Sequence, residues 1–175
     1  MPIPSLEGLV TERLYFRPLT TADMPAWMPF ITSPEAMRFL GRALGNDDAC
    51  RQWFDRQLGR YAAGEGGLYA VVDRSTGTLL GQAGLLVQQL EGVHELEVGY
   101  HFLPEVWGRG YATEAARACM DRAFALRLAP SLISMVHTAN ERSARVARRN
   151  GLIWERQVTF RELPVDIFRI HTPHQ

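Results

Sequence analysis

The pattern of apolar and polar positions predicts a strand, a tight turn and a helix in the middle of the chain. Apolar side chains recur at intervals of three and four between residues 112 and 126, which is the spacing of one helical face. These positions are Ala112, Ala115, Ala116, Cys119, Met120, Ala123 and Leu126. Residues 95–102 upstream predict a strand, and Gly108 and Gly110 lie between the two elements.

The rest of the chain predicts one domain over residues 1–175, since no repeat, low-complexity tract or linker divides it. Further strands are predicted at residues 11–19, 68–72, 78–87, 131–137, 153–160 and 165–171. Further helices are predicted at residues 47–62 and 140–150. Between residues 24 and 39, three prolines predict short, broken helices, and residues 88–92 predict a polar turn.

Composition narrows the class of protein. The 175 residues include 19 basic and 19 acidic side chains, so the formal net charge is zero and does not favour nucleic acid or an anionic membrane. The sequence contains no Cys/His cluster, and Cys50 and Cys119 fall on predicted helices, as small core residues do. No secretory signal begins the sequence, and no apolar run approaches the ~20 residues that span a bilayer. We therefore expect a cytoplasmic protein without a bound metal.

The glycine turn is a candidate anion site. The first turn of a helix presents backbone N–H groups without a partner inside the helix, and the helix dipole adds partial positive charge there. Glycines allow close approach to a ligand, so a phosphate would suit this position, although a bare strand-to-helix connection is the alternative. A Walker A loop requires lysine where Tyr111 stands, and a dinucleotide fingerprint requires glycine where Thr113 stands.

The residues around this turn resemble the GNAT superfamily of acetyl-CoA-dependent N-acetyltransferases. The pyrophosphate loop of that family reads Gln/Arg-x-x-Gly-x-Gly/Ala, and residues 107–112 match it, except that Trp107 replaces the leading Gln/Arg. The longer pattern Pro-x-x-Trp-Gly-x-Gly-Tyr-Ala-Thr-Glu-Ala is similar to the ribosomal-protein N-terminal acetyltransferase branch. It is matched at every fixed position from Pro104 to Ala115.

This resemblance implies an α+β fold in a single domain: a mixed, mostly antiparallel sheet of about seven strands flanked by helices. Two parallel strands, ending near Phe102 and His137, would splay apart to hold acetyl-CoA; an ordinary paired strand is the alternative. Freed backbone groups would pair with the pantetheine amides, and one N–H near residues 100–102 would polarise the thioester. The implied coenzyme-binding residues are Tyr100, His101, Phe102, Trp107, Gly108, Arg109, Gly110, Tyr111, Ala112, Thr113, Asn140 and Ser143.

Ser143 is the candidate proton donor to the departing thiolate. Residues 140–143 match the Asn-x-x-Ser start of the family's next helix, although Asn140 also suits a plain helix N-cap. Many members of the family carry a tyrosine seven residues after this asparagine as the general acid. Ala147 occupies that position here, so Ser143 or an ordered water is the candidate substitute.

Glu97 is the candidate general base that removes the amine proton. It immediately precedes Val98-Gly99-Tyr100, as an acid does in the resembled branch, and Glu95 shares its strand face. A solvated strand face is the alternative for both carboxylates. His94 and His101 are further candidate proton carriers, with structural roles as the alternative.

We expect an N-acetyltransferase that moves the acetyl group of acetyl-CoA directly to a primary amine, because neither cysteine lies at the expected thioester. The alternatives are a catalytically silent acyl-CoA-binding regulatory module and, from the arginines of residues 142–149, a nucleic-acid-binding domain. The acceptor, a protein N-terminus or a small amine, would be shaped by residues 27–46 and 160–165. Its identity and the presence of a homodimer stay open.

Overall fold

The structure, a computed structural model, describes residues 2–41 and 45–172. Within them, a seven-stranded sheet has the order β1-β2-β3-β4-β5-β7-β6. The strands are β1 (Leu14–Arg17), β2 (Gly66–Asp73), β3 (Leu79–Leu90), β4 (Val93–Phe102), β5 (Ser131–His137), β6 (Ile153–Phe160) and β7 (Leu163–His171). Every neighbouring pair is antiparallel except β4 and β5, which confirms the predicted mixed sheet in a single α+β domain.

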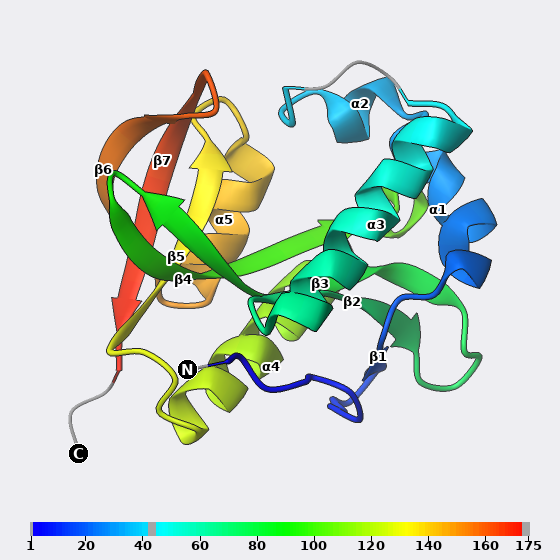
Figure 1. The fold of residues 1–175 in the computed structure, drawn as a ribbon, viewed down its shortest axis with the longest axis horizontal. Helices are drawn as coiled ribbons and strands as arrows, with labels where there is room; N and C mark the ends of the chain where they lie inside the picture. Colours follow the sequence, from blue (N-terminus) through cyan, green and yellow to red (C-terminus); the bar gives the residue numbers. More distant parts are fainter. Residues whose placement is uncertain (1, 42–44, 173–175) are drawn as a thin grey trace.

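Helices cover the sheet (Figure 1). They are α1 (Met24–Ile31), α2 (Pro34–Met37), α3 (Asp47–Ala63), α4 (Tyr111–Ala125) and α5 (Glu141–Arg149), with the 3-10 turns η1 (Thr21–Asp23) and η2 (Pro104–Val106). The helix α3 packs on β2 and α1 packs on α3, whereas α4 packs on β3 and β4. Broken helices before α3 are confirmed, because Ser33 caps α2 by accepting a hydrogen bond from the Ala36 N–H and Pro34 begins the helix.

One predicted turn differs from the structure. The strand β3 continues to Leu90, so the predicted turn at residues 88–92 is wrong in its first part. The chain reverses at Glu91 and Gly92, whose φ angles of 50° and 83° suit a two-residue hairpin. The glutamines before this turn remain in register with β4, and the side chain of one of them, Gln88, donates a hydrogen bond to Glu97 in the pocket described below.

The core is continuous across the domain. Trp27 stacks on Phe30 with ring centroids 4.4 Å apart, and both contact Trp53 of α3. Cys50 and Cys119 are buried free thiols, which confirms their prediction as small core residues. Among the described residues, no group of acidic, cysteine or histidine side chains could hold a metal ion, and no helix could span a membrane.

The strands β4 and β5 meet at a single point. In the part of the chain that the structure describes, Glu97 and Ile133 are the one pair of strand partners between them. Beyond that pair, β4 continues to Phe102 with its other edge bonded to β3, and β5 continues to His137 with its other edge bonded to β7. The two parallel strands therefore splay apart, as the resemblance implied, and the backbone edges that face each other across the gap are left without a strand partner.

Candidate active site

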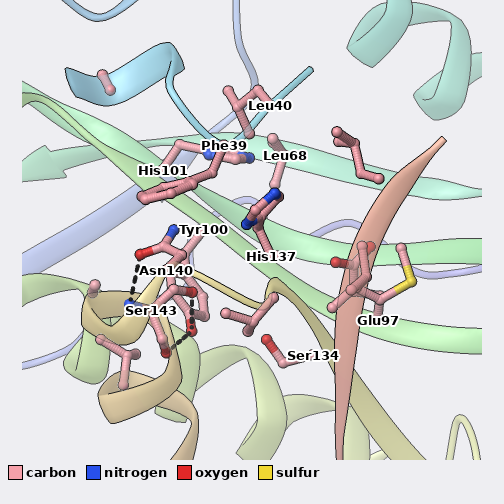
Figure 2. Close-up of a pocket in the computed structure, with 18 of the residues that line it drawn as sticks. Phe39, Leu40, Leu68, Glu97, Tyr100, His101, Ser134, His137, Asn140 and Ser143 are labelled. Carbon is pink, nitrogen blue, oxygen red and sulfur yellow. Dashed lines mark hydrogen bonds between the residues drawn. The ribbon is translucent and has the colours of Figure 1, made fainter. Parts of the chain in front are cut away.

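A cavity of about 650 Å³ opens where β4 and β5 diverge. Figure 2 shows His137 near its middle, with Tyr100 and Ser143 to one side and Glu97 to the other. We call the part lined by Trp107, Ala112, Asn140, Arg142 and Ser143 the α4 end, and the part around Glu97 lined by Arg56, Arg60 and Arg161 the arginine end. Segments far apart in the sequence thus contribute to one hollow.

Backbone N–H groups gather at the α4 end. The glycine turn places Gly108 and Gly110 at φ angles of 77° and 81°, in the left-handed region that glycine favours, and Gly110 is the N-cap of α4. No side chain caps this helix, and within the described residues the N–H groups of residues 108–113 form no hydrogen bond to the protein. A Cβ added at Gly108 would meet no protein atom within 4 Å. An anion therefore has both the donors and the space that it needs.

Two contacts fix this turn to the sheet. The Trp107 indole N–H donates to the Phe102 carbonyl oxygen at 2.7 Å, so the residue that replaces the family's Gln/Arg ties the turn to the end of β4. On the other side, the Arg13 guanidinium donates to the Arg109 carbonyl oxygen at 2.8 Å and pairs with Glu114 at 2.6 Å. The turn is consequently held in position before any ligand arrives.

Glu114 joins α4 to the start of β1. Its carboxylate accepts hydrogen bonds from the Thr11 hydroxyl, from the Arg13 backbone N–H and from the Arg13 guanidinium. Burial by itself would raise the pKa of Glu114, but these hydrogen bonds and the charge of Arg13 outweigh it and lower the pKa. Sequence periodicity placed Glu114 on the polar face of α4 and did not reveal these partners.

The first turn of α5 carries the Ser143 hydroxyl. The Asn140 side chain caps this helix by accepting the Ser143 N–H at 3.1 Å, which confirms the N-cap interpretation. The Tyr100 hydroxyl lies 3.2 Å from the Ser143 Oγ and donates to the Ser143 carbonyl oxygen at 3.1 Å. Burial raises the pKa of Tyr100, so this phenol stays protonated at neutral pH. Ala147, at the position of the family's usual tyrosine, is buried in the core.

Glu97 faces the cavity from β4. It accepts a hydrogen bond from the Gln88 side-chain amide at 2.7 Å. Burial raises the pKa of Glu97, and the hydrogen bond from Gln88 with the positive charges of Arg60 and Arg161 offsets part of that rise. Glu97 is only 9% exposed, so the alternative interpretation that it lies on a solvated strand face is wrong.

Glu95 does not share this environment. Its carboxylate forms a bidentate ion pair with Arg169 of β7, at 2.7 and 3.0 Å, and it does not line the cavity. The Arg169 side chain is only 12% exposed, so this pair joins β4 to β7 rather than serving a ligand. Glu95 is accordingly removed as a candidate base. His94 is exposed at the start of β4 and does not line the cavity, so it is removed as a candidate proton carrier.

Two histidines line the cavity. His101 packs its ring edge-on against Phe30 and Trp53, with centroids 5.6 and 5.1 Å away. His137, which the sequence did not single out, stacks on Phe39 at 5.1 Å, and its Nδ1 accepts the Ala139 N–H at 3.1 Å. Because Nδ1 accepts this hydrogen bond, Nε2 is the ring nitrogen that carries a proton and can donate it. Its only signal in the sequence was its place at the end of a strand beside Asn140.

The predicted coenzyme residues divide into two groups. Tyr100, His101, Phe102, Trp107, Ala112, Asn140 and Ser143 line the cavity. Gly108, Arg109, Gly110, Tyr111 and Thr113 do not line it but form the adjoining turn and first helical turn. Of these, the Tyr111 ring lies under the Arg13 guanidinium at 4.4 Å, and the Thr113 hydroxyl oxygen is buried without a partner among the described residues.

The segments predicted to shape the acceptor site also reach the cavity. Phe30, residues 35, 36 and 38–41, and residues 160, 161, 163 and 165 line it, while residues 42–44 of the predicted segment lie outside the described residues. The arrangement offers an anion site at one end, a buried carboxylate at the other and hydroxyl groups between them. Such a set suits transfer of a group from an anionic carrier to a nucleophile that must lose a proton.

Comparisons with known proteins agree with this chemistry. The family model described as an acetyltransferase (GNAT) domain matches residues 13–153. The protein YkkB of Bacillus subtilis (strain 168) is 31% identical over 162 residues, which is 91% of this chain and 93% of YkkB. The crystal structure of an acetyltransferase from Agrobacterium tumefaciens str. C58 is 32% identical, covers 95% of both chains and has a TM-score of 0.81.

A more distant structure shares the fold. RimL, the ribosomal L7/L12 α-N-protein acetyltransferase solved in complex with coenzyme A, has a TM-score of 0.75 over 98% of both chains at 16% identity. At that identity the similarity shows the fold alone. The resemblance drawn from residues 104–115 is thus confirmed by a match that spans most of the chain.

Proposed function

Because this chain belongs to the GNAT family of acetyltransferases, we propose that it transfers an acetyl group from acetyl-CoA directly to a primary amine. The observation that carries the proposal is the set of backbone N–H groups at residues 108–113 that bond to no described protein atom and lie beside a splayed cavity. We also propose that the protein works in the cytoplasm, as the sequence led us to expect.

The α4 end suits the pyrophosphate of the coenzyme. Phosphate oxygens would accept the N–H groups of the glycine turn and of the first turn of α4, where the helix dipole favours negative charge. The open space beside Gly108 and the Thr113 hydroxyl, which has no hydrogen-bond partner among the described residues, are consistent with a ligand at this place. The pantetheine arm would then run between β4 and β5 and bond to their free edges, as an added strand does.

Glu97 is suited to remove the proton of the amine. A carboxylate whose pKa is raised by burial is a stronger base than an exposed one, and its hydrogen bond from Gln88 holds it in place. The nitrogen bonds to the acetyl carbon as its proton passes to Glu97, directly or through a water. No acyl-enzyme is required, and both cysteines lie in the core away from the cavity lining.

Ser143 and Tyr100 are suited to protonate the departing thiolate. When the carbon–sulfur bond breaks, the sulfur keeps the electron pair and takes a proton from the Ser143 hydroxyl. Tyr100, within hydrogen-bonding distance of that hydroxyl, positions it and supports the proton transfer, and solvent restores the proton afterwards. Ser143 would thus take the role of the family's tyrosine, whose position is occupied here by Ala147, and Tyr100 of β4 lies next to Ser143.

Calorimetry and a thiol-release assay test the proposal together. Coenzyme A at millimolar concentration should release heat on binding, and acetyl-CoA with a suitable amine should release free thiol. Binding without thiol release across peptides, polyamines, amino acids and aminoglycosides would instead indicate a silent acyl-CoA-binding module. A folded sample that shows no heat with coenzyme A would overturn both.

A further inference from the structure

The arginine end of the cavity carries more positive than negative charge. Arg56 and Arg60 reach it from successive turns of α3 and Arg161 from the β6–β7 turn, and Arg38, just after α2, also lines the cavity. Glu97 is the acid among them, and the burial that raises its pKa also favours its neutral form. The other acids in the lining, Glu35 and Glu141, pair with arginines of α5.

In the described part of the chain, Arg60 is the one arginine of this group whose side chain forms hydrogen bonds to the protein, while Arg38 and Arg161 lie over the rings of Phe39 and Phe160. Arg60 donates to the Val87 carbonyl oxygen at 3.0 Å and lies 3.4 Å from the Gln88 side chain, so it supports the residue that holds Glu97. Among the described residues, Arg38, Arg56 and Arg161 form no ion pair with any carboxylate. Arg56 is half-buried, whereas Arg38 and Arg161 are exposed.

A half-buried guanidinium in an apolar setting calls for an anion. Apolar side chains line the same cavity, and they include Phe39, Leu40, Leu68, Leu86, Leu163 and Val165. In such surroundings a guanidinium is poorly hydrated, and a carboxylate can accept two parallel N–H bonds from it. A cationic ligand such as a polyamine would meet like charges here and gain only the one buried carboxylate, so the lining disfavours it.

We propose that the acceptor is a small amine that also carries a carboxylate, bound with its amino group toward Glu97 and its carboxylate toward Arg56 and Arg161. The inference rests on the proposed function and narrows its substrate class to amino acids and related amino carboxylates. The apolar lining favours members with a hydrophobic side chain, which would pack against Leu68 and Leu163.

Matched acceptors test this directly. Thiol release from acetyl-CoA would be measured with the hydrophobic amino acids, with their carboxamides, with the corresponding simple amines and with a diamine. An amino acid, its carboxamide and the corresponding simple amine share one side chain and differ only in the group at the carboxylate position. We expect kcat/KM for the amino acids to exceed that for the carboxamides by at least tenfold, because a neutral carboxamide cannot accept the charge-assisted hydrogen bonds that a carboxylate accepts from a guanidinium.

Two variants of α3 locate the effect. Arg56→Gln should reduce the preference for the amino acid over its carboxamide toward unity. Arg51→Gln, a substitution on the exposed part of the same helix and outside the cavity lining, should keep the preference. Binding of coenzyme A, followed by calorimetry, checks that both variants are folded.

The outcomes separate the two proposals. Equal or faster turnover of carboxamides, simple amines or the diamine would overturn the carboxylate inference and leave acetyl transfer intact. An unchanged preference in Arg56→Gln would overturn the role of this arginine and the inference with it. If the protein binds coenzyme A but releases no thiol from acetyl-CoA with any of the amines, whatever their charge, the proposed transferase function itself would be overturned.

Discussion

The burial of Glu97 in the cavity lowers the folding stability of the protein at any pH at which this carboxylate is ionised. Glu97 is a buried carboxylate, and its raised pKa means that ionising it costs more in the folded protein than in the unfolded chain. Its contribution to stability is therefore complete at a pH below the unfolded pKa and declines as the pH rises through the folded pKa. A group kept ionisable under that penalty is characteristic of a functional site.

The substitution Glu97→Gln should separate activity from stability. Glutamine can still accept the Gln88 hydrogen bond but cannot take a proton, so kcat/KM should fall by about 10²–10⁴ and lose its rise at the pH where Glu97 deprotonates. The melting temperature near neutral pH should increase, since the buried charge is removed. A pH–rate profile identical to that of the unsubstituted protein would contradict the role of Glu97 as base.

The Tyr100–Ser143 contact leads to a prediction about the leaving group. Ser143→Ala should lower kcat by about 10²-fold or more, because the thiolate would lose its proton donor. Tyr100→Phe should cause a smaller loss in kcat and leave the affinity for coenzyme A nearly unchanged, because the phenol acts through Ser143. Pre-steady-state thiol release together with calorimetry distinguishes these effects, and an unaltered kcat in Ser143→Ala would remove this serine from the mechanism.

At the level of elements, the glycine turn is the local structure that a ligand would contact. Gly108 and Gly92 have φ angles of 77° and 83°, and a Cβ at either position would meet no protein atom within 4 Å. Alanine should therefore cost about 1–2 kcal/mol of folding stability at each site, through backbone strain alone. The two positions lie beyond opposite ends of β4, so only Gly108 borders the amide groups of residues 108–113.

This pair gives a controlled test of the turn. Gly108→Ala should weaken coenzyme A binding by at least tenfold, because the new methyl group occupies space that the pyrophosphate needs. Gly92→Ala should lose comparable stability and keep its affinity. Chemical denaturation and calorimetry measure the two quantities, and equal affinities in both variants would contradict a phosphate site at this turn.

The sequence predicted those elements whose signals are local. The strand, turn and helix around Gly110 depend on neighbouring residues, so periodicity and two glycines were sufficient. Partnerships between distant residues were not visible: Ser143 meets Tyr100 across 43 positions, and Arg13 meets Glu114 across 101. Gln88 was assigned to a turn because a polar side chain in a hairpin resembles a loop until its partner Glu97 is known.

The sheet of the whole molecule consists of two segments that are joined by little strand pairing. Strands β1 to β4 form one segment and β5 to β7 the other, and Glu97 with Ile133 is the one backbone pair recorded between them among the described residues. The Glu95–Arg169 ion pair adds a second connection from β4 to β7. The cavity exists because these connections leave the far ends of β4 and β5 apart.

The gap between β4 and β5 leaves backbone N–H and C=O groups with which a bound ligand can pair. The coenzyme, bound along the free edges of β4 and β5, would form hydrogen bonds to both strands as an added strand does, and would thereby link the two segments. At a concentration of 100 times its Kd it should add about 2.7 kcal/mol to the free energy of unfolding. Amide hydrogen exchange at residues 98–102 and 134–137 should slow on binding, while exchange in β6, at the outer edge, stays as it was.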